Sequence, residues 1–318
     1  NAATNLTLNS AITATGRTVT MNLDAGGTGG ILSFSGASVA GTTLAVVGGA
    51  GADTFNLRGL TAAPATFTIN GAGGADTIVG NNSGDTFHIN GANSGTVAGG
   101  GVTVTSFTNI PNLDAGTGGD LFIFGAAGSI TSIVGSTGSD SINLAALAAA
   151  TVNLTSSGTG NGFSGTSTVG VTNFTNIDSI TSAAGGTLQN GIGSAAAWNV
   201  GASDTLVNGG HSLTFAGFTT LTGNGSGTLT ATDGAANTWT INSAGGGSVA
   251  GGVAYTFTGM TSLTAGTGGD SFTFGASGSM GTINGNSGSD SISLTALAAA
   301  TVNLTSSGTG NGFSGTST

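Results

Sequence analysis

The sequence predicts an all-β chain that winds as a β-solenoid, of the parallel β-helix or β-roll kind. Residues 115 to 168 return as residues 265 to 318, shifted by 150 positions, and 43 of these 54 positions are identical. Short stretches of alternating apolar and polar residues are separated by glycine-rich turns, which is typical of strands. Because a repeated unit buries its apolar face by stacking on its neighbours, these observations together indicate a solenoid.

The two copies also indicate which side chains face inward. Residues 120–124 are Asp-Leu-Phe-Ile-Phe, and residues 270–274 are Asp-Ser-Phe-Thr-Phe. Both phenylalanines are kept, whereas the leucine and isoleucine beside them become serine and threonine. A period of two is that of a strand, so we expect the phenylalanines inside and the variable positions outside.

The composition opposes helices and several classes of function. The 12 acidic residues are all aspartates, Glu and Lys are absent, and Arg17 and Arg58 are the only cations. Exposed helix positions are usually filled by Glu, Lys and Arg, so long helices are not expected. A net charge of −10 leaves nothing to neutralise phosphates, so nucleic acid is not an expected partner. Every apolar run is interrupted well before about 18 residues, so no membrane span is expected.

Aspartate turns indicate the length of one coil. Asp120 and Asp140 lie 20 positions apart in the first copy of the long repeat, and Asp270 and Asp290 have the same spacing in the second. Stacking in this register places Phe122 over Ile142 and Phe272 over Ile292, which forms apolar columns.

A second marker extends this register along the chain. The sequence Phe-Thr-Asn-Ile at residues 107–110 and 174–177 returns loosely at residues 215–218 and 257–260. The successive shifts of 67, 41 and 42 positions correspond to three, two and two coils. We therefore expect coils of roughly 20 to 22 residues, about seven in each long repeat and about 14 to 16 in all. Residues 1–318 are expected to form one continuous repeat array, a window of a longer protein.

The aspartate turns are also the candidate metal sites. Residues 48–56 fit the nonapeptide Gly-Gly-x-Gly-x-Asp-x-apolar-x of calcium-binding β-roll repeats, and residues 71–79 and 80–88 follow in looser tandem. This resemblance implies that each aspartate and its turn carbonyls supply half of a Ca²⁺ site. The candidate calcium residues are Asp53, Asp76, Asp85, Asp120, Asp140, Asp270 and Asp290.

A purely structural interpretation of these turns stays open beside the calcium interpretation. Several turns, such as those near Gly162 and Gly185, carry no aspartate, and Asn237 falls where a loose alignment expects Asp85. Aspartate in a glycine-rich turn also forms hydrogen bonds to its own backbone without any metal.

Other chemistry-bearing residues favour structural roles. His88 and His211 are distant in sequence and have no second His or Glu nearby, so strand positions are expected rather than catalysis or metal binding. Trp198, Trp239 and Tyr255 are expected in the core or its ladders rather than on a carbohydrate platform. Thr-x-Thr occurs at irregular spacings, which disfavours an ice-binding face.

Longer recurring sequence segments resemble a known class of repeats. Ala-Gly-Thr-Gly-Gly-Asp-x-Phe at residues 115–122 and Gly-Ser-Asp-Ser-Ile-x-Leu at residues 138–144 both return in the second copy. They resemble the repeats of giant bacterial surface proteins, the filamentous-haemagglutinin-like and RTX-type adhesins. The resemblance implies an extracellular or cell-surface location and a role as stalk, adhesin or filament in biofilm-like settings.

Three functions follow as alternatives. The first is a structural segment of an extracellular filament or adhesin stalk that stacks end to end on copies of itself and contacts other cell surfaces or glycans. The second is a glycan-binding or ice-binding solenoid module. The third, a polysaccharide-degrading β-helix enzyme, needs a paired acid and base in one groove, and a chain without Glu does not favour it. We therefore expect no enzymatic activity.

Overall fold

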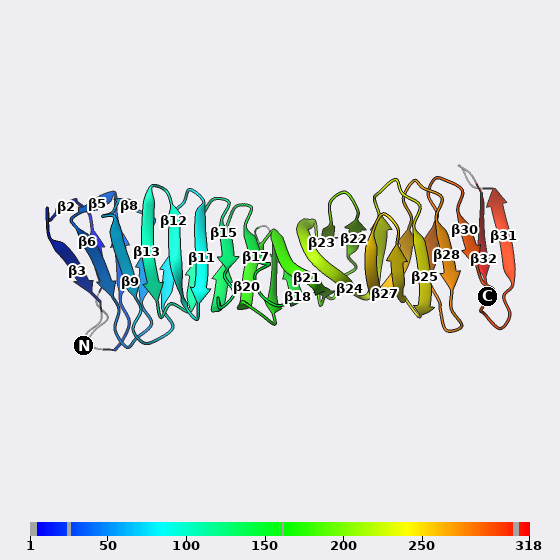
Figure 1. Ribbon diagram of the computed structural model, residues 1–318, viewed down its shortest axis with the longest axis horizontal. Coiled ribbons are helices and arrows are strands. Elements are labelled where there is room, and N and C mark those ends of the chain that lie inside the picture. The colour runs from blue at the N-terminus through cyan, green and yellow to red at the C-terminus, as the bar shows by residue number, and fades with distance from the viewer. Residues whose placement is uncertain (1–4, 24–26, 159, 161, 308–311) are drawn as a thin grey trace. The chain divides into compact units, whose positions relative to one another are not determined.

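The computed structural model describes residues 5–23, 27–158, 160, 162–307 and 312–318 (Figure 1). Every regular element in these ranges is a strand, which confirms the all-β prediction. Because the described ranges contain no helix, none of them provides a long apolar helix that could cross a membrane.

The contacts divide the chain into two compact units. The first holds residues 1–150 and 157–183, and the second holds residues 151–156 and 184–318. The long strand β21 (Ser179–Asn190) contributes to both. One continuous array over residues 1–318 stays a prediction.

The first unit begins with a stack of short strands. These are β1 (Asn5–Leu8), β2 (Ile12–Thr13), β3 (Thr18–Asn22), β4 (Ile31–Phe34), β5 (Ala37–Ala40), β6 (Thr43–Val47), β7 (Thr54–Asn56), β8 (Leu60–Ala62), β9 (Thr66–Asn70) and β10 (Thr77–Val79). It continues with β11 (Asp85–Gly91), β12 (Ser94–Gly99), β13 (Val102–Thr108), β14 (Asn112–Asp114), β15 (Leu121–Phe124), β16 (Ile130–Val134), β17 (Ser141–Leu144), β19 (Phe163–Ser167) and β20 (Val171–Ile177).

The second unit has the same kinds of strand. They are β18 (Thr151–Ser157), β22 (Ala197–Val200), β23 (Thr205–Asn208), β24 (His211–Ala231), β25 (Thr238–Ser243), β26 (Gly246–Ala250) and β27 (Ala254–Thr264). The last five are β28 (Ser271–Phe274), β29 (Thr282–Asn284), β30 (Ser291–Ser293), β31 (Val302–Ser307) and β32 (Phe313–Ser317).

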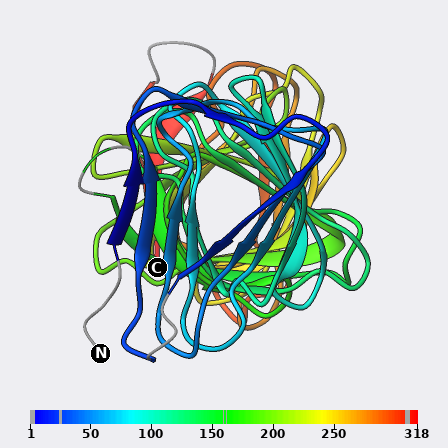
Figure 2. The ribbon, with the colours of Figure 1, turned by 90° about the vertical axis from the view of Figure 1, so that its left-hand side faces the viewer.

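Parallel pairing between successive passes of the chain builds the first unit. Strand β1 pairs with β4, β4 with β7, and β7 with β10, all parallel. A second wall is formed by β3, β6 and β9, and Figure 2 looks along the direction in which these strands are stacked. Like positions therefore form columns, as in Leu32 over Phe55 over Ile78, all fully buried. Such columns remove apolar area from water while the backbone groups pair with the strands above and below.

The register predicted from the aspartate turns is confirmed in both copies of the long repeat. Phe122 pairs with Ile142 between β15 and β17, and Phe272 pairs with Ile292 between β28 and β30. Both phenylalanines are buried, and the side chains beside them face outward. The comparison of the two copies thus identified the inward face correctly.

A uniform coil length is wrong elsewhere. Strands β11, β12 and β13 form an antiparallel excursion, and so do β25, β26 and β27. The strand after an insertion returns late. Thr77 pairs with Asn112 across the first excursion, and Ile130 pairs with Val171 across an insertion in which β19 pairs antiparallel with β20. The long interval from Ile130 to Val171 is therefore one parallel step with an inserted hairpin, where the sequence predicted two coils for an interval of this length.

Candidate functional site

The predicted aspartates occupy equivalent positions, at or directly ahead of the first residue of a strand. Asp120, for example, precedes β15, and Asp140 precedes β17. Asp290 is exposed, and the other six side chains are buried. Those six are Asp53, Asp76, Asp85, Asp120, Asp140 and Asp270.

Glycine makes room for these carboxylates. A Cβ placed on Gly48 would lie 2.5 Å from Oδ2 of Asp53, and one on Gly80 would lie 2.3 Å from Oδ2 of Asp85. Both distances are shorter than van der Waals contact allows, so the turn needs glycine where the aspartate folds inward. The glycine and aspartate positions of the nonapeptide are thus linked by packing.

The carboxylates form a ladder along the first unit. In two separate runs, Asp53 to Asp76 and Asp85 to Asp178, the backbone N–H of an aspartate donates to a carboxylate oxygen of the aspartate one parallel step later. Asp85 donates to Asp120, Asp120 to Asp140 at 2.9 Å, and Asp140 to Asp178 at 3.0 Å. Asp53 likewise donates to Asp76 at 2.7 Å. Each of these hydrogen bonds joins one turn to the next, so the ladder holds successive turns in register.

The second unit repeats this ladder with one amide in it. The N–H of Asn237 donates to Oδ1 of Asp270 at 2.7 Å, and the N–H of Asp270 donates to Oδ1 of Asp290 at 2.8 Å. Asn237 therefore stands at the ladder position that Asp85 has in the first unit, as the sequence alignment indicated. Its side-chain amide donates to Oδ1 of Asp233 at 2.9 Å.

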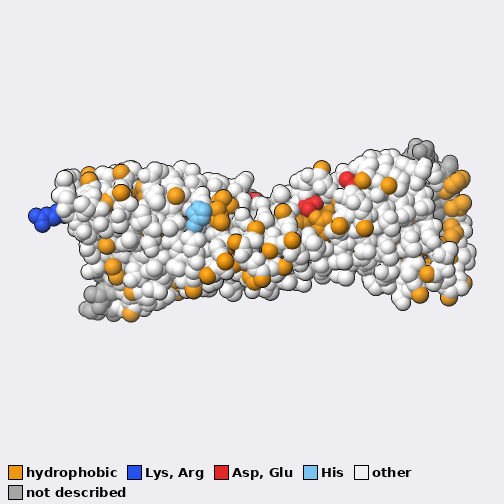
Figure 3. Space-filling view, viewed as in Figure 1, with side chains coloured by type: hydrophobic (Ala, Val, Ile, Leu, Met, Phe, Trp, Pro, Cys, Tyr) orange, Lys and Arg blue, Asp and Glu red, His pale blue; other side chains and the backbone are white. Residues whose placement is uncertain are grey.

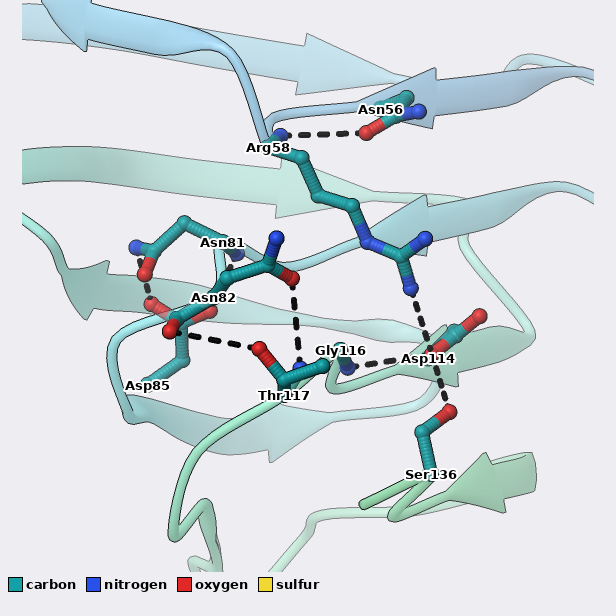
Figure 4. Close-up of polar contacts among 9 residues, drawn as sticks. All are labelled: Asn56, Arg58, Asn81, Asn82, Asp85, Asp114, Gly116, Thr117 and Ser136. Carbon is teal, nitrogen blue, oxygen red and sulfur yellow. Dashed lines mark hydrogen bonds and ion pairs between the residues drawn. The ribbon is translucent and has the colours of Figure 1, made fainter. Parts of the chain in front are cut away.

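The aspartates fall into two groups according to whether their second carboxylate oxygen, Oδ2, accepts a hydrogen bond. In Asp53 it accepts the N–H of Gly49 at 2.7 Å, and in Asp85 it accepts the N–H of Asn81 at 2.6 Å (Figure 4). These bonds to the residue four positions earlier are the turn-forming bonds that the structural interpretation expects. Oδ2 atoms that are buried and accept no hydrogen bond in the described chain belong to Asp76, Asp120, Asp140, Asp233 and Asp270.

Burial changes the acidity of the ladder. It raises the pKa of Asp76 from its ordinary 3.8 to about 6, and those of Asp85 and Asp140 to about 7, against the lowering effect of the backbone hydrogen bonds. The pKa values of Asp120 and Asp270 are raised for the same reason. An ionised carboxylate loses its hydration on burial, so these groups keep their protons to higher pH than ordinary aspartates do.

The arginines do not neutralise this ladder. Arg58 reaches along the outer surface to Oδ1 of Asp114 at 3.6 Å, with the two side chains 40% and 30% exposed (Figure 4). The same Asp114 oxygen accepts the hydroxyl of Ser136 at 2.9 Å. Within the described ranges this is the one ion pair of an arginine with an aspartate, and it lies outside the ladder.

The side chains alone do not assemble a calcium site. Ca²⁺ takes about six to eight oxygen ligands. The described residues contain no group of three or more acidic or histidine side chains placed to hold a metal, and Oδ1 of each of the seven candidate aspartates is engaged by a backbone or amide N–H. Calcium at these turns stays a prediction, with the unengaged Oδ2 atoms as its remaining carboxylate ligands.

Sequence reasoning missed four aspartates with defined contacts, one of which is Asp233, the acceptor of the Asn237 side-chain amide. Asp178 ends the first ladder, far beyond the position after Asp140 that a constant aspartate spacing indicates. Asp204 accepts the hydroxyl of Tyr255, and Asp114 pairs with Arg58. Nothing in the local sequence distinguishes these residues from ordinary turn aspartates.

The tryptophans, the tyrosine and the histidines all lie in strands. Trp198 and Trp239 are fully buried, which confirms their place in the core. Tyr255 is half-buried on β27, where it pairs with Val249, and its hydroxyl donates to Asp204, so it lies in a strand ladder at the border of the core. His88 is exposed on β11 and His211 begins β24, and neither forms an ion pair with an acidic group in the part of the chain described.

No family model matches the chain, and no curated protein or solved structure is significantly similar to it.

Proposed function

We propose that this chain is a β-solenoid segment of an extracellular bacterial filament or adhesin stalk, whose role is structural. The observation that carries the proposal is the return of one strand arrangement in the second copy of the long repeat. Phe122, in the first copy, stacks on Phe87 of the preceding strand β11, with ring centroids 4.8 Å apart. Phe272, in the second copy, stacks in the same way on Trp239 of the preceding strand β25 at 5.6 Å.

Repetition of this kind allows a structural array to become longer by adding passes that make the same contacts as the existing ones. Each pass pairs with the previous and the next one, so stability is distributed along the array. A chain with 4% charged residues offers few groups for catalysis, which supports a structural role over an enzymatic one.

Electron microscopy of the native material tests the proposal. Long thin filaments on the cell surface, labelled by an antibody against residues 1–318, are the expected result. Cytoplasmic labelling without filaments would contradict it. Incubation with acidic and neutral polysaccharides should leave them uncleaved, and cleavage would favour the enzyme instead.

A binding module is the second candidate because of the threonines of the second unit. Thr220 and Thr222 of β24 pair in register with Thr256 and Thr258 of β27, so Thr-x-Thr pairs are stacked on neighbouring strands. A regular array of hydroxyl groups is the feature that ice or a crystalline glycan would contact. Thermal hysteresis or glycan-array binding by the isolated chain would favour this candidate.

A further inference from the structure

The second unit has an apolar edge built from β29, β30, β31 and β32, here called the C-terminal edge. A hollow of about 830 Å³ opens there, and its lining includes Phe272, Ile283, Ile292 and Phe313. Ile292 is 56% exposed and Phe313 is 73% exposed. Hydrophobic side chains gather at this end of the chain in the space-filling view (Figure 3).

The long repeat contains a second version of this edge with its cover in place. The residues that correspond to Ile292 and Phe313 are Ile142 and Phe163, which are 1% and 0% exposed. The corresponding strands β16, β17 and β19 each pair with a strand of the segment 171–182, which supplies β20 and the start of β21.

Three apolar side chains of that segment lie in register with the lining. Phe174 pairs with Ile133, Ile177 with Phe163, and Ile180 with Ile142. The counterparts of these lining residues in the second copy are unchanged in type, at positions 283, 313 and 292. The hollow therefore has the lining that Phe174, Ile177 and Ile180 cover in the first copy.

The hydrogen bonds of the aspartate ladder differ between the two copies in the same way. The N–H of Asp140 donates to Oδ2 of Asp178, and the carbonyl of Asp140 accepts the N–H groups of Asp178 and Ser179. Asp290 is the counterpart of Asp140, and its N–H donates to no acceptor in the described chain. An unpaired strand end of this kind is a template for another strand.

We propose that the C-terminal edge binds one further parallel β-coil with the sequence pattern Val-x-x-Phe-x-x-Ile-Asp-x-Ile of residues 171–180. The aromatic and aliphatic side chains of this coil fill the hollow, and its aspartate accepts the N–H of Asp290. This inference rests on the proposed function, since binding of a like coil is how a stacking segment is extended.

A chain extended by its own covering segment tests the proposal. Residues 169–190 are appended after Thr318, because Val169 follows the equivalent Thr168 in the first copy. Amide hydrogen exchange of residues 291–293 is then measured, with residues 238–241 as the internal check that the second unit stays folded. We expect exchange at residues 291–293 to slow at least about tenfold.

Matched extensions separate specific docking from the mere addition of residues. In the control, the appended segment carries Phe174→Ser, Ile177→Ser and Ile180→Ser, and exchange should remain as in the unextended chain. A second control carries Asp178→Ala in the appended segment and should show reduced protection. Equal exchange in the extended, control and unextended chains, with residues 238–241 protected in all of them, would overturn the proposal.

The concentration dependence of the unextended chain identifies a different occupant. Protection of residues 291–293 that grows with protein concentration would assign the edge to a second copy of the chain, and the proposal would be wrong. Native filaments together with an edge that ignores the appended coil would refute this inference alone and leave the proposed function standing. Absence of native filaments, together with protection of residues 291–293 by the appended coil, would refute the proposed function and leave this inference standing.

Discussion

Residues 142–163 and residues 292–313 have closely similar sequences but different surroundings. Ile142 and Phe163 are completely buried, whereas Ile292 and Phe313 are 56% and 73% exposed. The segment 171–182 accounts for the difference, because its strands pair in parallel with β17 and antiparallel with β19. The burial of a strand in a stacked sheet is therefore set by the next pass of the chain as much as by its own residues.

The difference between the copies vanishes one step further inside. Phe122 and Phe272 have strands on both sides, and both are at most 1% exposed. The missing cover thus affects burial only in the adjacent pass of the chain, as expected for a repeat array in which each pass contacts only its neighbours. The comparison of the two copies is thus an internal measurement of what one covering coil contributes.

The largest expected effect is a contrast between two equivalent alanine substitutions. Phe163→Ala empties a fully buried position and should lower the free energy of unfolding by about 3 to 5 kcal/mol. Phe313→Ala removes a side chain that is 73% exposed, and its effect should lie within about 0.5 kcal/mol. Native-state hydrogen exchange of the strands around each site measures both.

The inner pair supplies the control for this contrast. Phe122→Ala and Phe272→Ala should each cost about 3 to 5 kcal/mol, because both phenylalanines are enclosed. Equal losses for Phe163 and Phe313 would mean that Phe313 is covered in solution, contrary to the comparison.

The parts of the fold that follow from local pattern could be predicted from the sequence. Period-two alternation identified Phe122 and Phe272 as inward, and the interval between Asp120 and Asp140 identified the pairing of β15 with β17. The excursion through β11, β12 and β13 could not be predicted in this way, because its alternation is the same whether a strand pairs parallel or antiparallel.

The candidate site was predicted in its positions and missed in its chemistry. Seven aspartates were recognised as turn residues, but burial, and hence the raised pKa of Asp140, depends on packing between passes that one turn sequence does not encode. Asp178 was missed because an inserted hairpin lengthens the preceding step. Insertions of variable length conceal register, while regular spacing reveals it.

The second largest effect concerns pH. The pKa values of Asp85 and Asp140 rise to about 7 in the folded chain, whereas the same carboxyls ionise near 3.8 when unfolded. Between about pH 4 and 7 the folded state therefore binds more protons than the unfolded state, so the free energy of unfolding falls as pH rises. Thermal unfolding should show the highest melting temperature near pH 4 and a lower one at pH 8.

Matched amide substitutions distinguish the ladder from other titrating groups. Asp140→Asn keeps an acceptor for the N–H of Asp120 but cannot ionise. The decrease in the free energy of unfolding between pH 4 and 8 should therefore become smaller by about 3 kcal/mol. Asp85→Asn removes the other carboxyl whose pKa rises to about 7, and it should reduce the pH dependence in the same direction. Melting temperatures that rise with pH in the parent chain would contradict the sign derived above.

Removal of divalent cations has the next expected effect, and it tests calcium binding at the aspartate turns. A cation held only by the folded state stabilises it by about 2.7 kcal/mol when its concentration is a hundredfold above the dissociation constant. If calcium lies at the ladder, a chelator should lower the melting temperature at pH 8, and Asp140→Asn should reduce that shift. An unchanged melting curve would leave the aspartates with their hydrogen-bonding role alone.

The smallest expected effect belongs to the charged pair on the outer surface. Arg58→Ala removes a contact at 3.6 Å between side chains that are 40% and 30% exposed, and such pairs contribute about 0 to 1 kcal/mol. Arg17→Ala is the matched control, because it removes the same charge at an exposed residue that forms no ion pair in the described chain. Unfolding of the two variants should differ by less than about 1 kcal/mol, and the difference should disappear at high salt. A larger loss for Arg58→Ala would show that the outer surface, rather than the buried columns and ladder, holds neighbouring passes of the first unit together.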